Sequence, residues 1–352
     1  MRSSVFAIAL VVLGCAPAAK TVTPEEKLTS ASAGSGLSPQ MMAAMANAQK
    51  MASMSQAARA AAEGACAALL RHTPSWDEER AIGQWLAINA VARQGHLFLD
   101  GAEEKDPAKL NERLATRKAV ALPEGGRNAV SAHVALVGKN LARFSSRPEV
   151  PWVFGVIENE TPDALSTAGG YVFVTTGLLK KMTNEAQLAG VLAHEIGHVV
   201  HKHSLTKYLD ARHKQCIAAK YAAYLIEHGT NGGPAVDELA RFARNFDDPD
   251  LGAADAGFAR FIMQALVTLQ QFGTDGESEL QTDRTALELV SFAGYDATEY
   301  EKFLTTLGDR PQHPKAVDRV AKLKALREGE LKAFAHGTAK PDLAQVFAPL
   351  SP

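Results

Sequence analysis

The sequence lacks a long apolar run and a surplus of charge of either sign, and it contains only three cysteines. Its 37 basic and 39 acidic residues nearly cancel, so no polybasic face is available and no nucleic-acid partner is predicted. The N-terminal apolar run, residues 5–13, is too short to cross a bilayer, which needs about 20 residues. A later run at 258–269 is broken by Arg260 and Gln264, so it is not a membrane span either. At 352 residues and 46% hydrophobic content, the chain can still bury one large core or two modest ones.

The N-terminus is typical of a bacterial export signal. Arg2 precedes the apolar run, and the residues Val-Leu-Gly-Cys that end at Cys15 resemble a lipobox, whose cysteine is lipidated and becomes the new N-terminus. An ordinary signal peptide with an incidental cysteine is the alternative. We favour a lipoprotein with residues 1–14 as signal peptide, anchored to the membrane by acyl chains. Because Ala16 rather than Asp follows the cysteine, we expect a periplasm-facing protein of the cell envelope, at the outer membrane rather than the inner one.

Residues 15–64 are predicted to separate this anchor from the main domain. Up to residue 50 the chain is rich in Ala, Ser, Thr, Pro, Gly and Met without an apolar period, which indicates a tether. The Ala-rich stretch 51–70 can form a helix. Cys66 and Cys216 could pair in an oxidising periplasm or could be two small buried apolar residues, and we favour the second interpretation.

The rest of the chain predicts an α+β fold, mostly α-helical, with a small β-sheet. Ser75 and Glu78 form a capping box that begins one helix, and apolar residues at steps of three and four predict another over 127–144. Segments 152–157 and 169–175, rich in β-branched and aromatic residues, are predicted strands.

His194, Glu195 and His198 form a His-Glu-x-x-His motif within a helical pattern that begins near Asn184. On a helix, positions four apart differ by about 40° and about 6 Å, so both histidines can offer a nitrogen to one metal ion. Neutral imidazoles leave the charge of a zinc ion uncancelled, which acidifies water bound to it. Glu195 is turned about 100° from His194, so it can reach that water as a general base. Two helix histidines with an unrelated glutamate are the alternative interpretation.

A third ligand has to come from another segment. A three-histidine motif would need Gly at position 201 and His at position 204, where this chain has His201 and Ser204, so that class is excluded. Glu279 and Asp283 stand one turn apart on a later helix, so one can bind zinc while the other hydrogen-bonds a ligand imidazole. A merely charged helix face is the alternative. Three further histidines are expected on the surface or beside the metal ligands: His201, His203 and His213.

Segment 169–175 is also a candidate substrate shelf. Its Gly-Gly entrance, followed by β-branched and aromatic residues, fits an edge strand beside the metal helix. Extended peptides bind proteases by adding a strand to such an edge. A strand that merely covers the helix fits the pattern equally well.

Together these residues resemble peptidase family M48, zinc endopeptidases with HExxH followed by ExxxD, from about residue 75 to 320. Four segments before the motif share the likeness: 152–157, 169–174, 177–179 and 184–188. The resemblance implies a zincin-like fold, with the sheet next to the HExxH helix, and one zinc ion per chain. It implies that His194, His198 and Glu279 ligate zinc. It also implies that Glu195 is the general base and that Asp283 supports a ligand.

The family's His-Pro-x-x-x-x-Arg element is matched by His313, Pro314 and Arg319. By resemblance, His313 stabilises the oxyanion or caps the metal in a resting state, and Arg319 orients substrate or a carboxylate. One segment departs from the family. Where relatives usually show Asn-Ala-x-Ala-x-Pro-Gly-Gly, residues 163–170 are Asp-Ala-Leu-Ser-Thr-Ala-Gly-Gly, so we expect a substrate shelf of different detailed shape.

The sequence thus predicts a membrane-tethered zinc metalloendopeptidase, with its catalytic domain at 65–325 and a C-terminal tail at 326–352. The expected substrates are extended or misfolded polypeptides of the envelope. The competing hypothesis is a catalytically silent chaperone or assembly scaffold that keeps the fold and binds unfolded chains. A helix within 231–275 either completes the core, which we favour, or forms a lid over the cleft.

Overall fold

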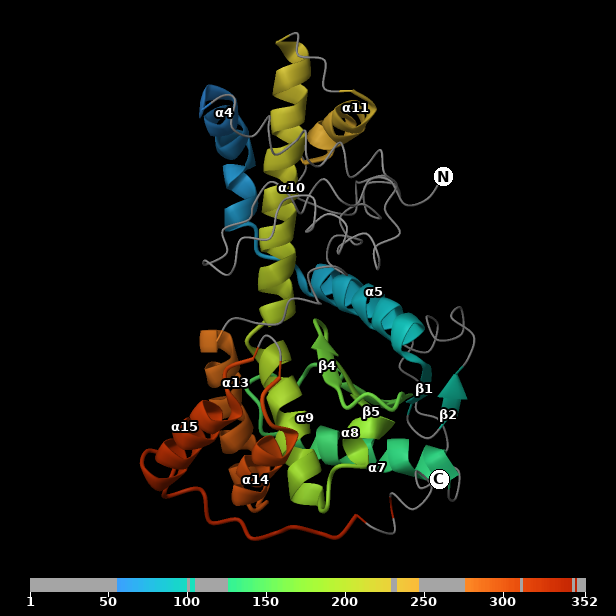
Figure 1. Ribbon diagram of the computed structural model, residues 1–352, viewed down its shortest axis with the longest axis vertical. Helices are drawn as coiled ribbons and strands as arrows, with labels where there is room; N and C mark the ends of the chain where they lie inside the picture. The colour runs from blue at the N-terminus through green and yellow to red at the C-terminus, as the bar shows by residue number, and fades with distance from the viewer. Residues whose placement is uncertain are drawn as a thin grey trace. The chain divides into compact units, whose positions relative to one another are not determined.

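The computed structural model describes residues 56–99, 102–104, 126–228, 233–246, 276–310, 313–343 and 346 (Figure 1). These residues belong to two compact units, divided near residues 73, 205 and 270. The expected signal peptide, Cys15, the tether and the apolar run at 258–269 lie outside the described residues. Within the part of the chain that is described, no helix has both the length and the apolar character needed to cross a bilayer.

The described part of the first unit is built of helices and contains a disulfide. Its elements are α4 (Gln56–Cys66), η1 (Ala67–Arg71), most of α10 (His203–Glu227), α11 (Pro234–Arg241) and η2 (Phe242–Phe246). Cys66, at the end of α4, is bonded to Cys216 in α10. The hypothesis of two unpaired cysteines is therefore wrong. Both are fully buried, as that hypothesis required, but their pairing spans a sequence separation of 150 and no local pattern reveals it.

The second unit contains a sheet in the order β2-β1-β3-β5-β4. Its strands are β1 (His96–Leu99), β2 (Ala102–Glu104), β3 (Val153–Glu158), β4 (Ala164–Thr167) and β5 (Tyr171–Thr175). β3 and β5 run parallel, and the other neighbouring pairs are antiparallel. Every residue of β5 is buried, because this strand lies between two others.

β4 forms one edge of the sheet and β2 forms the other. β4 pairs antiparallel with β5, with Ser166 opposite Val172, so the prediction that 169–175 forms an edge strand is wrong. β4 has four residues, and its Ala and Ser have little strand propensity, so its sequence resembles a loop. Gly169 and Gly170 make the turn between the two strands with φ of 75° and 91°, a backbone conformation that glycine adopts without strain.

Helices cover both faces of the sheet. α5 (Trp76–Gln94) lies on one face, and α7 (Gly126–Ala142) and α9 (Glu185–Val200) cover the other (Figure 1). Successive strand residues alternate between these layers: Phe173 packs in a cluster with α5 residues, whereas Val174 belongs to the core that includes α7 and α9. This alternation fixes which strand side chains can reach α9.

Among the described residues, four further helices belong to the second unit: α8 (Thr176–Leu179), α13 (Gly276–Phe292), α14 (Thr298–Leu307) and α15 (Ala316–Glu328). α13 packs along α9, and α14 contacts both α9 and α15. The predicted α+β class, mostly helical with a small sheet beside the HExxH helix, is confirmed. The predicted helix start at Ser75 is also confirmed, since its side chain accepts a hydrogen bond from the Glu78 N–H.

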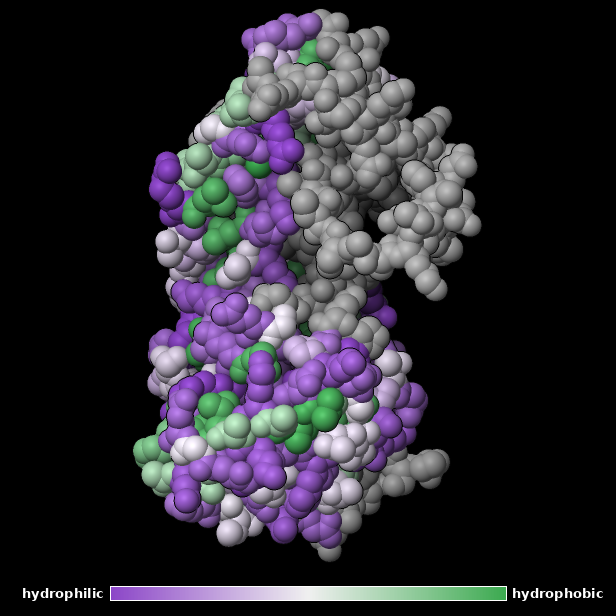
Figure 2. Space-filling view, turned by 60° about the vertical axis from the view of Figure 1, so that its left-hand side comes forward, coloured by the Kyte–Doolittle hydropathy of each residue, from purple (hydrophilic) through white to green (hydrophobic). Residues whose placement is uncertain are grey.

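The segment after α15 returns to the start of α9. Pro341 O accepts a hydrogen bond of 2.8 Å from the Glu185 N–H, and Asp342 forms a β-bridge with Asn184. Leu343 is buried in the core, so this segment anchors the first turn of the metal helix. On the face in Figure 2, apolar side chains of the described residues are interspersed among hydrophilic ones.

Candidate metal centre

The helix α9 directs both motif histidines to one point. Its first turn is capped by Asn184, whose side chain accepts a hydrogen bond from the Gln187 N–H. The helix is buried over almost its whole length, which fits its largely apolar sequence between the functional residues. Nε2 of His194 and Nε2 of His198 lie 3.1 Å apart. The spacing of four residues therefore produces the convergence expected from helix geometry.

α13 brings a carboxylate to the same point. Glu279 Oε2 lies 3.4 Å from His194 Nε2, and Glu279 Oε1 lies 3.6 Å from His198 Nε2. The ligand atoms of these three residues all lie within 4.8 Å of one another. Glu279 is 1% exposed, and among the described residues its Oε2 has no hydrogen-bond partner. A buried, unsatisfied carboxylate oxygen facing two imidazoles is what a metal site requires.

A glycine inside the motif permits this close approach of α13. Gly197 lies between the two histidines in sequence and faces α13. A Cβ at this position would lie 2.9 Å from Thr282 Cγ2 and 3.3 Å from Thr282 O. Any larger residue would push the helices apart, and Glu279 would move away from the histidines with α13.

Asp283, one turn after Glu279, orients the first histidine. Its Oδ1 lies 3.0 Å from His194 Nδ1, and the Tyr300 hydroxyl donates to the same oxygen at 2.9 Å. Arg319 donates to both carboxylate oxygens, at 2.6 and 2.7 Å. Burial works against ionisation of Asp283, but hydrogen bonds from Arg319 and His194 hold its pKa well below the usual range. The carboxylate is therefore charged and accepts the His194 Nδ1–H.

A further histidine lies against the second ligand. His203 Nδ1 is 2.8 Å from His198 Nδ1. With its Nδ1–H directed to Asp283, His194 turns its Nε2 toward His198 Nε2, and a proton or a metal ion can bridge the two nitrogens. Burial opposes protonation of His194, but the neighbouring carboxylates of Asp283 and Glu279 raise its pKa to about 9, so a proton can fill this role. Two imidazole nitrogens and a carboxylate oxygen are also a donor set that fits a divalent transition-metal ion.

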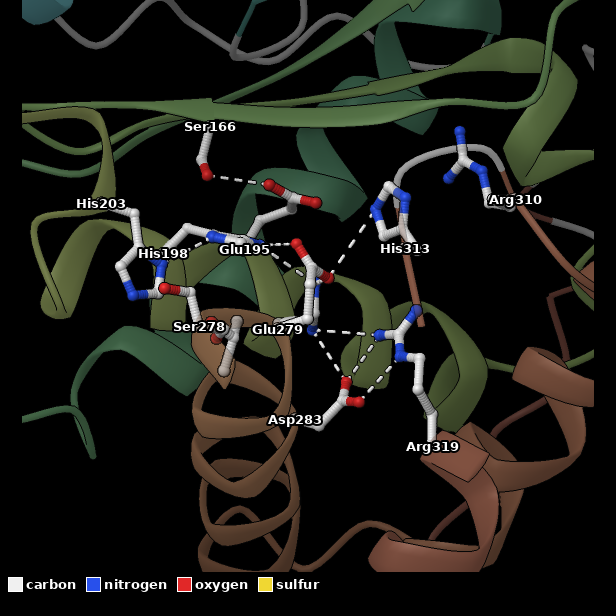
Figure 3. Close-up of polar contacts among 12 residues, drawn as sticks. Ser166, Glu195, His198, His203, Ser278, Glu279, Asp283, Arg310, His313 and Arg319 are labelled. Carbon is white, nitrogen blue, oxygen red and sulfur yellow. Dashed lines mark hydrogen bonds and ion pairs between the residues drawn. The ribbon is translucent and has the colours of Figure 1, made fainter. Parts of the chain in front are cut away.

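Glu195 follows His194 on α9 and flanks the three candidate metal ligands. It is 8% exposed, and its Oε2 accepts a hydrogen bond of 2.8 Å from the Ser166 hydroxyl of β4 (Figure 3). Burial raises the pKa of the Glu195 carboxyl, although the positive charge of His194 and the Ser166 hydrogen bond oppose this rise. A carboxylate with a raised pKa beside these candidate metal ligands is suited to receive a proton and release it again.

A pocket opens next to Glu195. Its wall includes His194, Glu195, Tyr300 and His313, together with apolar side chains from three helices: Leu178, Val191, Leu304 and Leu307. His313 Nε2 lies 3.7 Å from Glu279 Oε2, so His313 lies beside the candidate metal ligands on the side that faces the pocket. At another part of the wall, Arg310 donates to Asp163 Oδ1 at 2.7 Å.

The structure brings together the seven residues that the sequence marked as catalytic, metal-binding or supporting, in the positions described above, whereas Cys15 lies outside the described residues. Arg319 binds a carboxylate, that of Asp283, which is the second of its two expected roles. The three remaining histidines differ: His203 contacts His198, His201 lies 2.7 Å from Thr285 Oγ1, and His213 lies on α10 in the first unit. Sequence reasoning missed Ser166 and Tyr300, since each reaches the site from an element distant in sequence.

Comparisons with known proteins agree with this geometry. A model of peptidase family M48 matches residues 128–327, which include α9, α13 and most of α15. The chain is 36% identical over 114 residues to the mitochondrial metalloendopeptidase OMA1 of Schizosaccharomyces pombe, and this match covers 32% of each chain.

Two bacterial proteins are similar over longer stretches. The chain is 28% identical over 214 residues to protease HtpX of Legionella pneumophila, covering 53% of this chain and 73% of the relative. It is 27% identical over 176 residues to a putative beta-barrel assembly-enhancing protease of Vibrio cholerae, covering 49% of this chain and 32% of the relative. The chain thus spans 32% of the length of the yeast and Vibrio relatives.

Proposed function

The chain belongs to peptidase family M48, and from this premise we propose that it is a zinc-dependent endopeptidase that cleaves extended polypeptides. One observation carries the proposal. The Nε2 atoms of His194 and His198 converge on the buried, unsatisfied carboxylate of Glu279, with Glu195 beside them. This donor set of two nitrogens and one oxygen is one that catalytic zinc sites use.

In this proposal, His194, His198 and Glu279 hold zinc, which when bound supplies a Lewis acid that polarises a carbonyl and acidifies water. Glu195 takes the proton from the attacking water and delivers it to the amine that leaves. Asp283 holds the His194 ring with Nε2 facing the metal position, and Arg319 keeps Asp283 ionised. His313, on the pocket wall, donates a hydrogen bond to the carbonyl oxygen as negative charge develops on it.

The substrate class follows from the sheet edge. β4 pairs with β5 on one side, and among the described residues no strand pairs with its other side. β4 also contacts α9, and Ser166 joins it to Glu195. An extended chain that adds to this edge would form main-chain hydrogen bonds with β4 and would pass beside the three candidate metal ligands. Main-chain hydrogen bonds select an extended conformation rather than a particular sequence. Unfolded segments of envelope proteins satisfy this requirement.

The location in the envelope rests on the N-terminal sequence. Arg2, the short apolar run and Cys15 support a lipid anchor and a periplasm-facing protein, at the outer membrane. The Cys66–Cys216 disulfide supports an oxidising compartment. Incorporation of a palmitate analogue into the full chain tests the anchor: label should be present in the wild type and absent from Cys15→Ala.

The peptidase function is tested by cleavage of casein, an unfolded substrate, by the full chain. Cleavage should stop after removal of metal by a chelator and return when zinc is added, while magnesium should fail to restore it, because nitrogen ligands favour zinc. Binding of casein without cleavage in zinc-loaded protein would instead support the silent-scaffold alternative. Recovery with magnesium alone would contradict the proposed zinc site.

A further inference from the structure

Ser166 reaches the Glu195 carboxylate from the edge of the sheet. Its hydroxyl donates to Glu195 Oε2 at 2.8 Å, across a sequence separation of 29 (Figure 3). We propose that Ser166 is a positioning residue, which holds the Glu195 carboxylate in the orientation needed for proton transfer. The inference rests on the peptidase function proposed above.

The register of β4 determines that this residue faces α9. Ala164, two positions earlier, packs against the core that contains α9, whereas Leu165 packs on the opposite face with residues of α5. Thr167 also faces α5, where its hydroxyl donates to Gly83 O at 2.9 Å. Ser166 pairs with Val172, and a shift of one residue would turn an apolar or a differently bonded side chain toward Glu195.

The contact leaves one carboxylate oxygen for chemistry. Oε2 accepts from Ser166, and among the described residues no other hydrogen bond to the Glu195 carboxylate is present, so Oε1 is the oxygen available to water. The terminal torsion of a glutamate is broad and roughly two-fold, so it does not fix the carboxylate plane by itself. A hydrogen bond to a charged oxygen is stronger than a neutral one and restrains that torsion.

Removal of the hydroxyl should therefore affect the proton-transfer step and leave the metal ligands in place. The Ser166 hydroxyl bonds Glu195 and, among the described residues, makes no hydrogen bond to His194, His198 or Glu279. Its loss should leave the Asp283 and Glu279 contacts of His194 in place, because neither involves Ser166. The expected signature is a fall in kcat without a change in KM or metal affinity.

The test compares four full-length, zinc-loaded proteins in a peptide-cleavage assay: wild type, Ser166→Ala, Ser166→Thr and Ser291→Ala. We expect Ser166→Ala to lose about tenfold in kcat, the lower end of the effect of removing a supporting hydrogen bond. Ser166→Thr keeps the hydroxyl on a residue that strands favour, so it should restore most of the rate. Ser291→Ala removes another buried hydroxyl, which donates to Leu287 O within α13, and should keep the wild-type kcat. Thermal melting of each variant verifies that it is folded.

A second comparison tests whether Ser166 acts through Glu195. In protein that already carries Glu195→Gln, adding Ser166→Ala should not lower the residual rate further, because both changes act on the same group. An unchanged kcat in Ser166→Ala, a loss that Ser166→Thr does not restore, or a matching loss of metal affinity would overturn the inference while the peptidase function stands. If the wild type shows no metal-dependent cleavage, the proposed function fails, and this inference fails with it.

Discussion

Asp283 Oδ1 lies 3.0 Å from His194 Nδ1, so a carboxylate of α13 determines which nitrogen of a ligand on α9 faces the metal position. The same oxygen accepts hydrogen bonds from Tyr300 and Arg319, which fix the carboxylate in turn. Orientation of the first ligand thus depends on three residues that do not themselves bind metal. Their effects can be separated by measuring metal affinity and stability independently.

Substitution of Asp283 by Asn should weaken metal binding. The amide is isosteric but uncharged, so it no longer favours the His194 tautomer with an Nδ1–H, and we expect about a 10–100-fold loss of zinc affinity. Competition with a chromophoric chelator measures this loss. Asp318→Asn, at an exposed position of α15, is the matched control and should bind zinc like the wild type. Equal affinities of the two variants would contradict the role given to Asp283.

Substitution of Arg319 by Ala should destabilise the fold. Arg319 and Asp283 are both buried, and removal of one partner of such a pair leaves an uncompensated charge at a cost of about 3–5 kcal/mol. Denaturant unfolding of metal-free protein measures the change. The control is Arg284→Ala, whose side chain is 45% exposed and pairs with Glu288 and Glu330, so it should cost only about 0–1 kcal/mol. Similar losses of unfolding free energy in both variants would mean that the buried ion pair contributes no more to stability than the exposed one.

Metal affinity should increase with pH. In metal-free protein, burial lowers the pKa of His194, but the neighbouring carboxylates of Asp283 and Glu279 outweigh it and raise the pKa to about 9. Below this pH the metal must displace a proton, so affinity should rise about tenfold per pH unit and level off above pH about 9. Zinc titrations between pH about 6 and about 8 test the slope. Affinity that stays constant over this range would show that His194 binds no competing proton.

His313 should contribute to the rate rather than to metal binding. Its position on the pocket wall suits a donor to the developing oxyanion, and loss of one such donor costs about 10²–10³-fold in kcat. His313→Ala should therefore cleave casein slowly while it retains zinc. His336→Ala, an exposed histidine, serves as the control. A faster His313→Ala enzyme would instead assign His313 the capping role.

The metal site could be predicted because its ligands follow local helix geometry. His194 and His198 lie on one turn of one helix, and Glu279 and Asp283 on one turn of another, so their spacing encodes which side chains converge. That the two helices face each other was implied by family resemblance rather than by spacing. The structure adds the reason for their approach, the missing Cβ of Gly197 against Thr282.

Other features depend on contacts that local patterns do not encode. β4 is a strand because it pairs with β5, and its four residues show no clear strand pattern on their own, so Ser166 was not recognised as a partner of Glu195. Tyr300 reaches Asp283 from α14 through tertiary packing. Cys66 and Cys216 pair across 150 residues. Their sequence context predicts that both are buried but not that they lie close together.

In the proposed mechanism, Glu195 acts as the general base beside a bound zinc ion. The most direct measurement compares casein cleavage by wild type and Glu195→Gln, with the zinc content of both determined on the same samples. Glu149→Gln, an exposed residue, is the control. We expect equal zinc content in all three proteins and cleavage that is lost, by about 10²-fold or more, in Glu195→Gln alone. Equal cleavage by wild type and Glu195→Gln at equal zinc content would contradict this mechanism.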